Sequence, residues 1–162
     1  IKNAVESINS PPPAAVENLP EKPVEKPAKE KQHMSHLRLS AQLLWLIKTY
    51  AAHHGISMKS FVQLSALSMQ TASNELVAKA CAELFRFDSG PATERATLKS
   101  SARFADLVIP DIASRFNGSI TLAFKASAAY VASLPAAEAA ALLQEAMQVD
   151  LRMHYQLTAA PR

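Results

Sequence analysis

The stretch SHLRLSAQLLWLIKTYAAHHGISMKSFV, residues 35–62, decides the fold that we predict for this chain. It opens with a period-two alternation in which Leu37 and Leu39 share one face. His36 and Arg38 share the opposite face. Alternation of this kind is typical of a strand with one buried side. We therefore expect the stretch to begin with a short half-buried strand.

A helical pattern follows the predicted strand. Apolar residues recur there at helical spacing, at Leu43, Leu44, Leu46, Ile47, Tyr50 and Ala51. Gly55 predicts the end of this helix, because glycine readily adopts the left-handed conformation that terminates helices. Ser57 is a candidate N-cap for a second helix that begins near Met58 and contains Phe61 and Val62. The predicted order is strand, helix, glycine turn, helix.

Residues 96–124, ATLKSSARFADLVIPDIASRFNGSITLAF, predict the same order a second time. A strand-like start at Thr97–Lys99 precedes an apolar stripe made of Phe104, Leu107, Val108, Ile112 and Phe116. Asn117-Gly118 marks the stop, and a helix follows from Ser119. Phe124 comes six residues after Gly118, just as Phe61 comes six residues after Gly55. The two stretches therefore match well at the end of the pattern.

The two stretches match less well at the strand. Aligning the glycines places Ser101 opposite Arg38, whereas aligning the strand leucines places Lys99 there. This surplus of two residues predicts a longer first helix in the second stretch. Pro110 lies within that helix, where it removes a hydrogen bond, and so we expect a bend there.

The composition favours a mostly helical protein. Hydrophobic residues make up 49% of the 162 residues, Ala is abundant, and there are only three glycines. The longest apolar run is too short to cross a bilayer, so we expect no membrane span. A single cysteine, Cys81, allows no internal disulfide and fits a reducing cytoplasm.

The charge distribution says more than the net charge of +3. No acidic residue lies between Glu30 and Glu75, where the basic side chains are Lys31, Arg38, Lys48 and Lys59, with His33, His36, His53 and His54. Such a local basic field is typical of a surface that faces phosphates. A solvated basic face without a partner gives the same pattern.

The rest of the chain divides into segments of distinct composition. We predict a disordered Pro/Glu/Lys-rich tether (1–33), a first copy of the motif with an extra helix capped by Ser73 (34–88), a linker (89–94), a second copy (95–134) and a C-terminal helix (135–162). The tether also suits a peptide docking site for a partner. The C-terminal helix is predicted to pack on the core through Leu142, Leu143, Ala146, Met147 and Leu151.

The strand-helix-helix order resembles the ribbon-helix-helix family of DNA-binding proteins. The resemblance implies a mainly α fold with a short two-stranded antiparallel ribbon, in which two copies pair their strands over a shared helical core. One chain that carries both copies would be a tandem ribbon-helix-helix, forming a pseudo-symmetric monomer or a weak homodimer. This single-chain form resembles the TraY-like accessory proteins of conjugative plasmid transfer and the border-binding accessory proteins of T-DNA transfer.

That resemblance implies double-stranded DNA as the partner, with the ribbon in the major groove. The base-reading residues would be His36, Arg38, Thr97 and Lys99. The phosphate-contacting residues would be Ser57, Met58 and Lys59 in the first copy, and Ser119, Ile120 and Thr121 in the second. A bacterial cytoplasmic relaxosome accessory factor, with a relaxase or other transfer protein as a further partner, is the implied role.

Each of these residues also has a plainer interpretation. An arginine between leucines is often a solvated edge residue, and a serine after a glycine is often a simple helix cap. Two other functions stay open, namely a repressor or antitoxin-type regulator of the same fold, and a helical interaction module in which Leu37–Leu39 is the first turn of a helix.

The sequence predicts neither an enzyme nor a cofactor. We find no nucleophile elbow, phosphate loop or HExxH motif. His53 and His54 are adjacent in a predicted helix, so their side chains diverge by about 100° rather than converge on a metal. We therefore expect no metal site.

Overall fold

The structure is a computed structural model, and it describes residues 33–159, with the side chains of residues 155–159 left out. The described residues belong to one unit, Gln32–Arg162. The predicted N-terminal Pro/Glu/Lys-rich segment (1–33) lies outside the described residues except for His33, which begins the first strand. The described part is mainly helical, with seven helices and one two-stranded antiparallel sheet.

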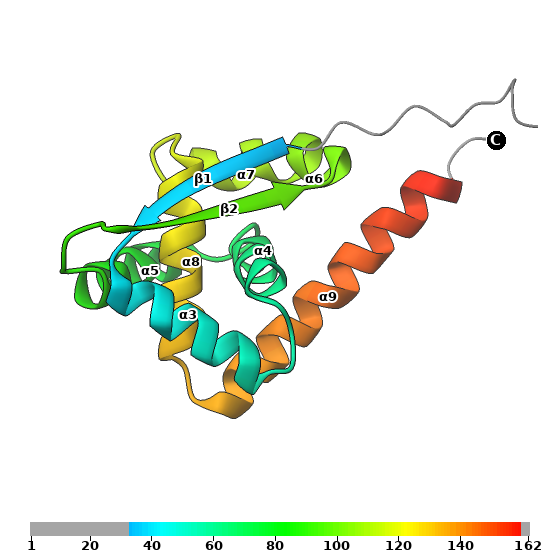
Figure 1. Cartoon of the computed structure of the whole chain (residues 1–162). Coiled ribbons are helices and arrows are strands. Elements are labelled where there is room, and N and C mark those ends of the chain that lie inside the picture. The colour runs from blue at the N-terminus through cyan, green and yellow to red at the C-terminus, as the bar shows by residue number, and fades with distance from the viewer. Residues whose placement is uncertain (1–32, 160–162) are drawn as a thin grey trace, which may run out of the picture. The chain divides into compact units, whose positions relative to one another are not determined.

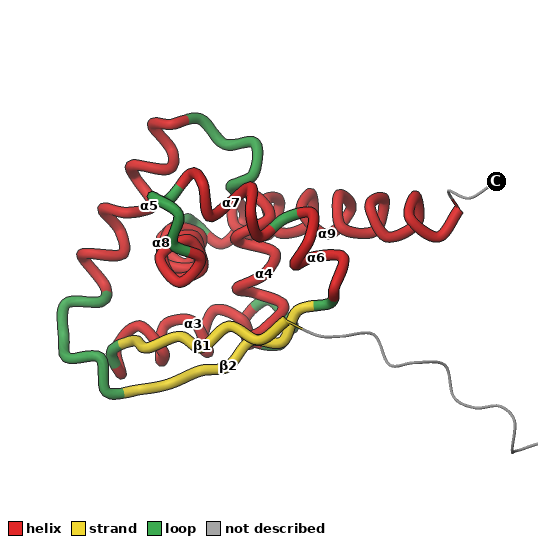
Figure 2. The backbone as a smooth tube through the Cα atoms, turned by 90° about the horizontal axis from the view of Figure 1, so that it is seen from above, coloured by secondary structure: helices red, strands yellow, loops and turns green. Residues whose placement is uncertain are grey.

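The two strands form an antiparallel ribbon (Figures 1 and 2). Strand β1 (His33–Leu39) pairs with β2 (Glu94–Ser100), and His36 lies opposite Thr97 at the centre. Leu37 and Leu39 point into the core as predicted, at 2% and 1% exposure. The ribbon therefore has one apolar face that a helical layer must cover. The alternative in which Leu37–Leu39 starts a helix is wrong.

Serine caps and glycine turns set the first two helices. Ser40 caps α3 (Ala41–His53) by accepting a hydrogen bond from the Leu43 amide. The chain then turns at Gly55, whose φ of +70° is the left-handed conformation that was predicted. Ser57 caps α4 (Met58–Ser68), which confirms the predicted N-cap.

The helix after β2 is broken rather than long and bent. Helix α6 (Ala102–Leu107) ends at Val108, and α7 (Ile109–Arg115) begins at the next residue. Pro110 lies in the first turn of α7, where a backbone N–H has no helical acceptor and proline is tolerated. The expected irregularity near Pro110 is therefore present, but it is a break between two short helices rather than a bend within one long helix. Leu107, predicted in the buried stripe, is 46% exposed at the break.

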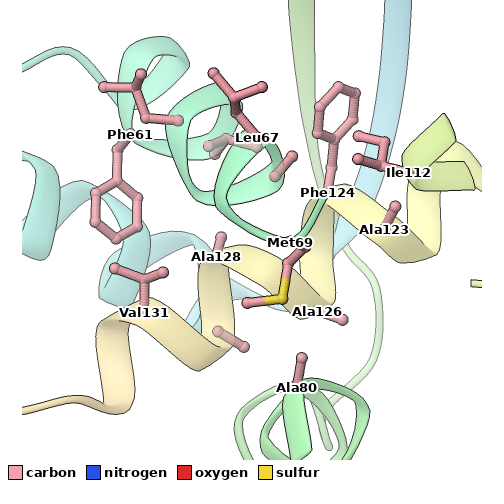
Figure 3. Packing of buried hydrophobic residues seen from close by; sticks show 14 of the residues in the cluster. Phe61, Leu67, Met69, Ala80, Ile112, Ala123, Phe124, Ala126, Ala128 and Val131 are labelled. Atoms are coloured by element: carbon pink, nitrogen blue, oxygen red, sulfur yellow. The ribbon is translucent and has the colours of Figure 1, made fainter. Parts of the chain in front are cut away.

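Helix α8 (Ile120–Ser133) lies at the centre of the core. Helices α3, α4 and α7, strand β1, and α5 (Asn74–Phe87) all pack on it. Small side chains on α8 allow this close approach, as Figure 3 shows for Ala126 and Ala128 between Phe61 of α4 and Ala80 of α5. Ser73 caps α5 as predicted.

The last helix, α9 (Ala136–Ala159), packs on α4 and α8. Ala139, Leu143 and Ala146 are buried there, so the predicted contact with the core holds for its first half. Met147 and Leu151 were predicted in the same stripe but are 40% and 63% exposed, so this part of the stripe is not buried in the core. No helix in the described residues is long and apolar enough to cross a membrane.

Candidate nucleic-acid interface

The outward face of the ribbon gathers six exposed side chains, three from each strand: Met34, His36, Arg38, Arg95, Thr97 and Lys99. They share one face because alternate residues of a strand point the same way. The other face is closed by buried residues such as Leu37 and Leu98. Five polar or basic side chains and Met34 thus lie above a buried apolar face of the ribbon.

The four predicted base-reading residues all lie on this outward face. The register places His36 directly opposite Thr97, and the His36 Nδ1 atom lies 3.3 Å from the Thr97 Oγ1 atom. Arg38 and Lys99 lie towards opposite ends of the ribbon, two residues to either side of this central pair. The structure therefore brings the four residues together in one surface.

Two further residues of this face were missed from the sequence. Arg95 lies directly opposite Arg38, and Met34 lies directly opposite Lys99. The predicted strand began at Thr97, whereas β2 begins at Glu94. The signal was present, because Arg95, Thr97 and Lys99 alternate with small or apolar residues. Extending that alternation backwards would have found Arg95.

The outward face is strongly basic. Arg38, Arg95 and Lys99 are all exposed, and in the described part of the chain none of them forms an ion pair. Arg38 and Arg95 are like charges at directly opposed positions, an arrangement that destabilises a ribbon. An anionic ligand at this end would relieve that repulsion.

The predicted phosphate-contacting residues lie at the first turns of α4 and α8. The hydroxyls of Ser57 and Ser119 act as helix caps, accepting from the amides three residues later at 3.0 and 3.1 Å. The plainer interpretation as caps is therefore correct for both hydroxyls. The first backbone N–H groups of each helix, which include those of Met58 and Ile120, have no helical acceptor and point along the helix axis away from its body.

Side chains from the same two helices hold the ribbon. The Gln63 side chain on α4 donates from Nε2 to the Lys99 carbonyl at 3.1 Å and to the Ser100 hydroxyl at 2.8 Å. The Lys125 ammonium on α8 donates to the Arg38 carbonyl at 2.8 Å. Both contacts end on the main chain of a basic outward-facing residue. We call these two contacts the Gln63 tether and the Lys125 tether.

The Lys125 tether includes an ion pair. Lys125 Nζ lies 3.0 Å from Asp88 Oδ2, and the two side chains are only 16% and 12% exposed. The other oxygen, Asp88 Oδ1, accepts from the Ser40 amide at 2.8 Å. Burial by itself raises the pKa of Asp88, but the hydrogen bonds from Ser40 and Lys125 and the charge of Lys125 outweigh it and lower that pKa. Asp88 is therefore held in its charged form.

His53 and His54 lie at the C-terminal end of α3. The rings of His53 and His54 meet edge to face, with centroids 5.2 Å apart. Burial and the neighbouring His53 lower the pKa of His54. Across residues 33–154, no group of three or more side chains is arranged to ligate a metal.

Comparison of this chain with models of protein families, with curated proteins and with solved structures finds no match.

Proposed function

We propose that this protein binds double-stranded DNA sequence-selectively by placing its ribbon in the major groove. The observation that carries this proposal is the outward face of the ribbon, where Arg38, Arg95 and Lys99 are exposed beside His36 and Thr97 and form no ion pair with any of the described side chains. The major groove admits a two-stranded ribbon, and side chains at alternate positions then reach base edges. The buried Leu37, Leu39 and Leu98 anchor the inner face of the ribbon in the core, which sets how far the outward side chains project.

The fold supports a tandem ribbon-helix-helix arrangement, which we propose as its basis. Each strand ends one residue before a serine N-cap, Ser40 after β1 and Ser101 after β2. Aligning these caps places Lys99 opposite Arg38 and Thr97 opposite His36, as the alignment of the strand leucines does. The two residues of surplus length then fall in the segment that contains the break at Val108.

The outward face is unlike at its two ends, and this favours a non-palindromic DNA site. Arg38 and Arg95 form one end, where guanidinium groups can pair with the O6 and N7 atoms of guanine. Met34 and Lys99 form the other end, where the Met34 side chain can contact a thymine methyl group. A single chain would thus read a directional sequence.

The role that we propose for this binding is that of a relaxosome-type accessory factor in plasmid or T-DNA transfer. A directional site suits this role, because a transfer origin is nicked on one strand and in one direction. A selected DNA site beside a nicking site would support the role. A selected site in the promoter of the protein's own gene would instead support a repressor of the same fold.

The test is DNA selection followed by binding measurements. Duplexes selected from a random pool are titrated with the full chain by fluorescence anisotropy at several salt concentrations, alongside a random duplex. We expect Arg38→Ala to weaken binding to the selected duplex by about 1–3 kcal/mol and to weaken binding to random duplex much less. Affinity for both duplexes should fall steeply with salt.

Lys79→Ala is the matched control, because Lys79 is an exposed cation on α5 rather than on the ribbon. It should leave the preference for the selected duplex unchanged. If the unmodified chain binds no duplex at low salt, the proposal is wrong.

A further inference from the structure

We infer that Gln63 and Lys125 are matched positioning residues, which set the depth at which the two strands present their base-reading side chains. This inference rests on the proposed DNA-binding function and deepens it. Neither residue lies on the outward face, and neither would touch DNA bases itself. Each acts through the main chain of a residue that would.

The two residues occupy the same place in their helices. Gln63 follows the N-cap Ser57 by six residues, and Lys125 follows the N-cap Ser119 by six residues. Both therefore lie in the second turn of the helix. From there, each donates to a strand carbonyl at 3.1 or 2.8 Å. The agreement in position indicates one structural role filled by two different side chains.

The two tethers cross between the strands. Helix α4 belongs to the segment that begins with β1, yet Gln63 holds β2 at Lys99. Helix α8 belongs to the segment that begins with β2, yet Lys125 holds β1 at Arg38. Each strand is thus fixed from outside the ribbon by the helix of the other segment. Sliding of one strand along the other would break both contacts.

The tethered residues are the two cations that the cap alignment makes equivalent. A bidentate contact between an arginine and a guanine needs placement to within about 0.5 Å and 10–20°. A strand that drifts by more than this still carries its charge to the phosphates but loses its base contacts. Loss of a tether should therefore reduce the preference for a selected site and leave the affinity for random duplex nearly unchanged.

The two tethers differ in what surrounds the donor. Gln63 is neutral and also satisfies the buried Ser100 hydroxyl, which is 1% exposed. Lys125 is charged, and Asp88 neutralises it while binding the Ser40 amide. Removing Lys125 alone would leave the Asp88 carboxylate with no cation, so the test of this tether needs a compensated variant.

The experiment measures the ratio of affinities for the selected and the random duplex in the full chain. Gln63→Met and the double variant Lys125→Met with Asp88→Asn remove the donors and keep side-chain bulk. We expect each to lower this ratio about 3- to 10-fold, the value of one hydrogen bond. Lys125→Arg, which keeps a charged donor, should restore most of the ratio.

Gln70→Met is the control, because the Gln70 side chain, seven residues after Gln63, donates to Asp111 and not to the ribbon. It should leave the ratio unchanged. Thermal melting confirms that each variant is folded. A merely structural role would lower affinity for both duplexes in proportion to the loss of folded protein, whereas a positioning role changes the ratio.

The outcomes separate the two proposals. A wild-type chain that prefers its selected duplex, together with folded tether variants that prefer it equally, overturns the positioning role and leaves the DNA-binding proposal standing. A wild-type chain that binds no duplex overturns both proposals.

Discussion

Two segments of the chain begin with a strand and end with a helix that follows a glycine turn. The first half consists of β1, α3 and α4, and the second half consists of β2, α6, α7 and α8. They differ in how the strand is connected to the turn. In the first half one uninterrupted helix joins the strand to the glycine turn. In the second half that connection is broken at Val108. The strands, the serine caps and the second helices correspond, whereas the connection between them varies. The two halves therefore share the order of strand, serine cap, glycine turn and second helix, and they differ in the helical segment between the strand and the turn.

The helix that follows each half in the sequence packs mainly on the other half. Helix α5 follows the first half in sequence but packs on α8 of the second half. Helix α9 follows the second half but packs mainly on α4 of the first half. Together with the crossed tethers, this packing means that neither half contains all of its own supports. We therefore expect the two halves to unfold together.

The largest loss of stability is expected from replacing the buried phenylalanine in the second helix of each half. Phe61 and Phe124 are both 0% exposed and each follows its turn glycine by six residues. Phe61→Ala and Phe124→Ala should each lower the free energy of unfolding by about 3–5 kcal/mol, because each leaves a cavity in the shared core. Urea denaturation measures both.

Phe85→Ala is the control for that pair, because Phe85 is 81% exposed and its loss should change stability by no more than about 0.5 kcal/mol. A cost below about 1 kcal/mol for either buried phenylalanine would contradict a core that the halves share equally.

The next effect comes from the contrast between the continuous and the broken helix. Lys48→Pro, in the interior of α3, should cost about 3 kcal/mol or more, since it removes a helical hydrogen bond and clashes with the preceding turn. Pro110→Ala should change stability by no more than about 1 kcal/mol, because Pro110 already lies where that hydrogen bond is not made.

Both variants are compared by denaturation, with Lys48→Ala to account for loss of the lysine side chain. Equal losses of stability from Lys48→Pro and Pro110→Ala would contradict the conclusion that the break at Val108 accommodates Pro110 without a lost helical hydrogen bond.

The smallest of the three effects concerns pH and distinguishes the tethers. The folded-state pKa of Asp88 lies below the ordinary value of 3.8, so its charged form contributes stability above that value. This contribution is lost as pH falls through the folded pKa. Asp88→Asn should cost about 1.5–3 kcal/mol at pH 7, and the difference from the unmodified chain should shrink below about pH 4.

Denaturation at pH 7, 5, 4 and 3 measures that difference. Gln63→Met serves as the comparison, because the Gln63 tether contains no titrating group and its cost should not change over the same range. A cost of Asp88→Asn that stays constant down to pH 3 would contradict the charged state assigned to Asp88.

Local signals in the sequence were enough to predict much of the fold. Alternation at Leu37 and Leu39 predicted a strand, and Ser57 and Gly55 predicted a cap and a turn, all of which the structure contains. Each of these signals acts within a few residues, through side-chain direction, a side-chain hydrogen bond or backbone freedom. The outward positions of Arg38 and Lys99 followed from the same alternation.

Only the tertiary structure decided how the pieces meet. The register of the two strands places Arg95 directly opposite Arg38, and the break at Val108 depends on how the surplus residues pack. The two tethers join residues 36 and 87 positions apart along the chain. A glutamine or a lysine on a helix carries no periodic signal of such a contact, because its partner is a main-chain carbonyl that every residue possesses. The sequence by itself therefore determined the elements, and packing determined which residues hold the ribbon in place.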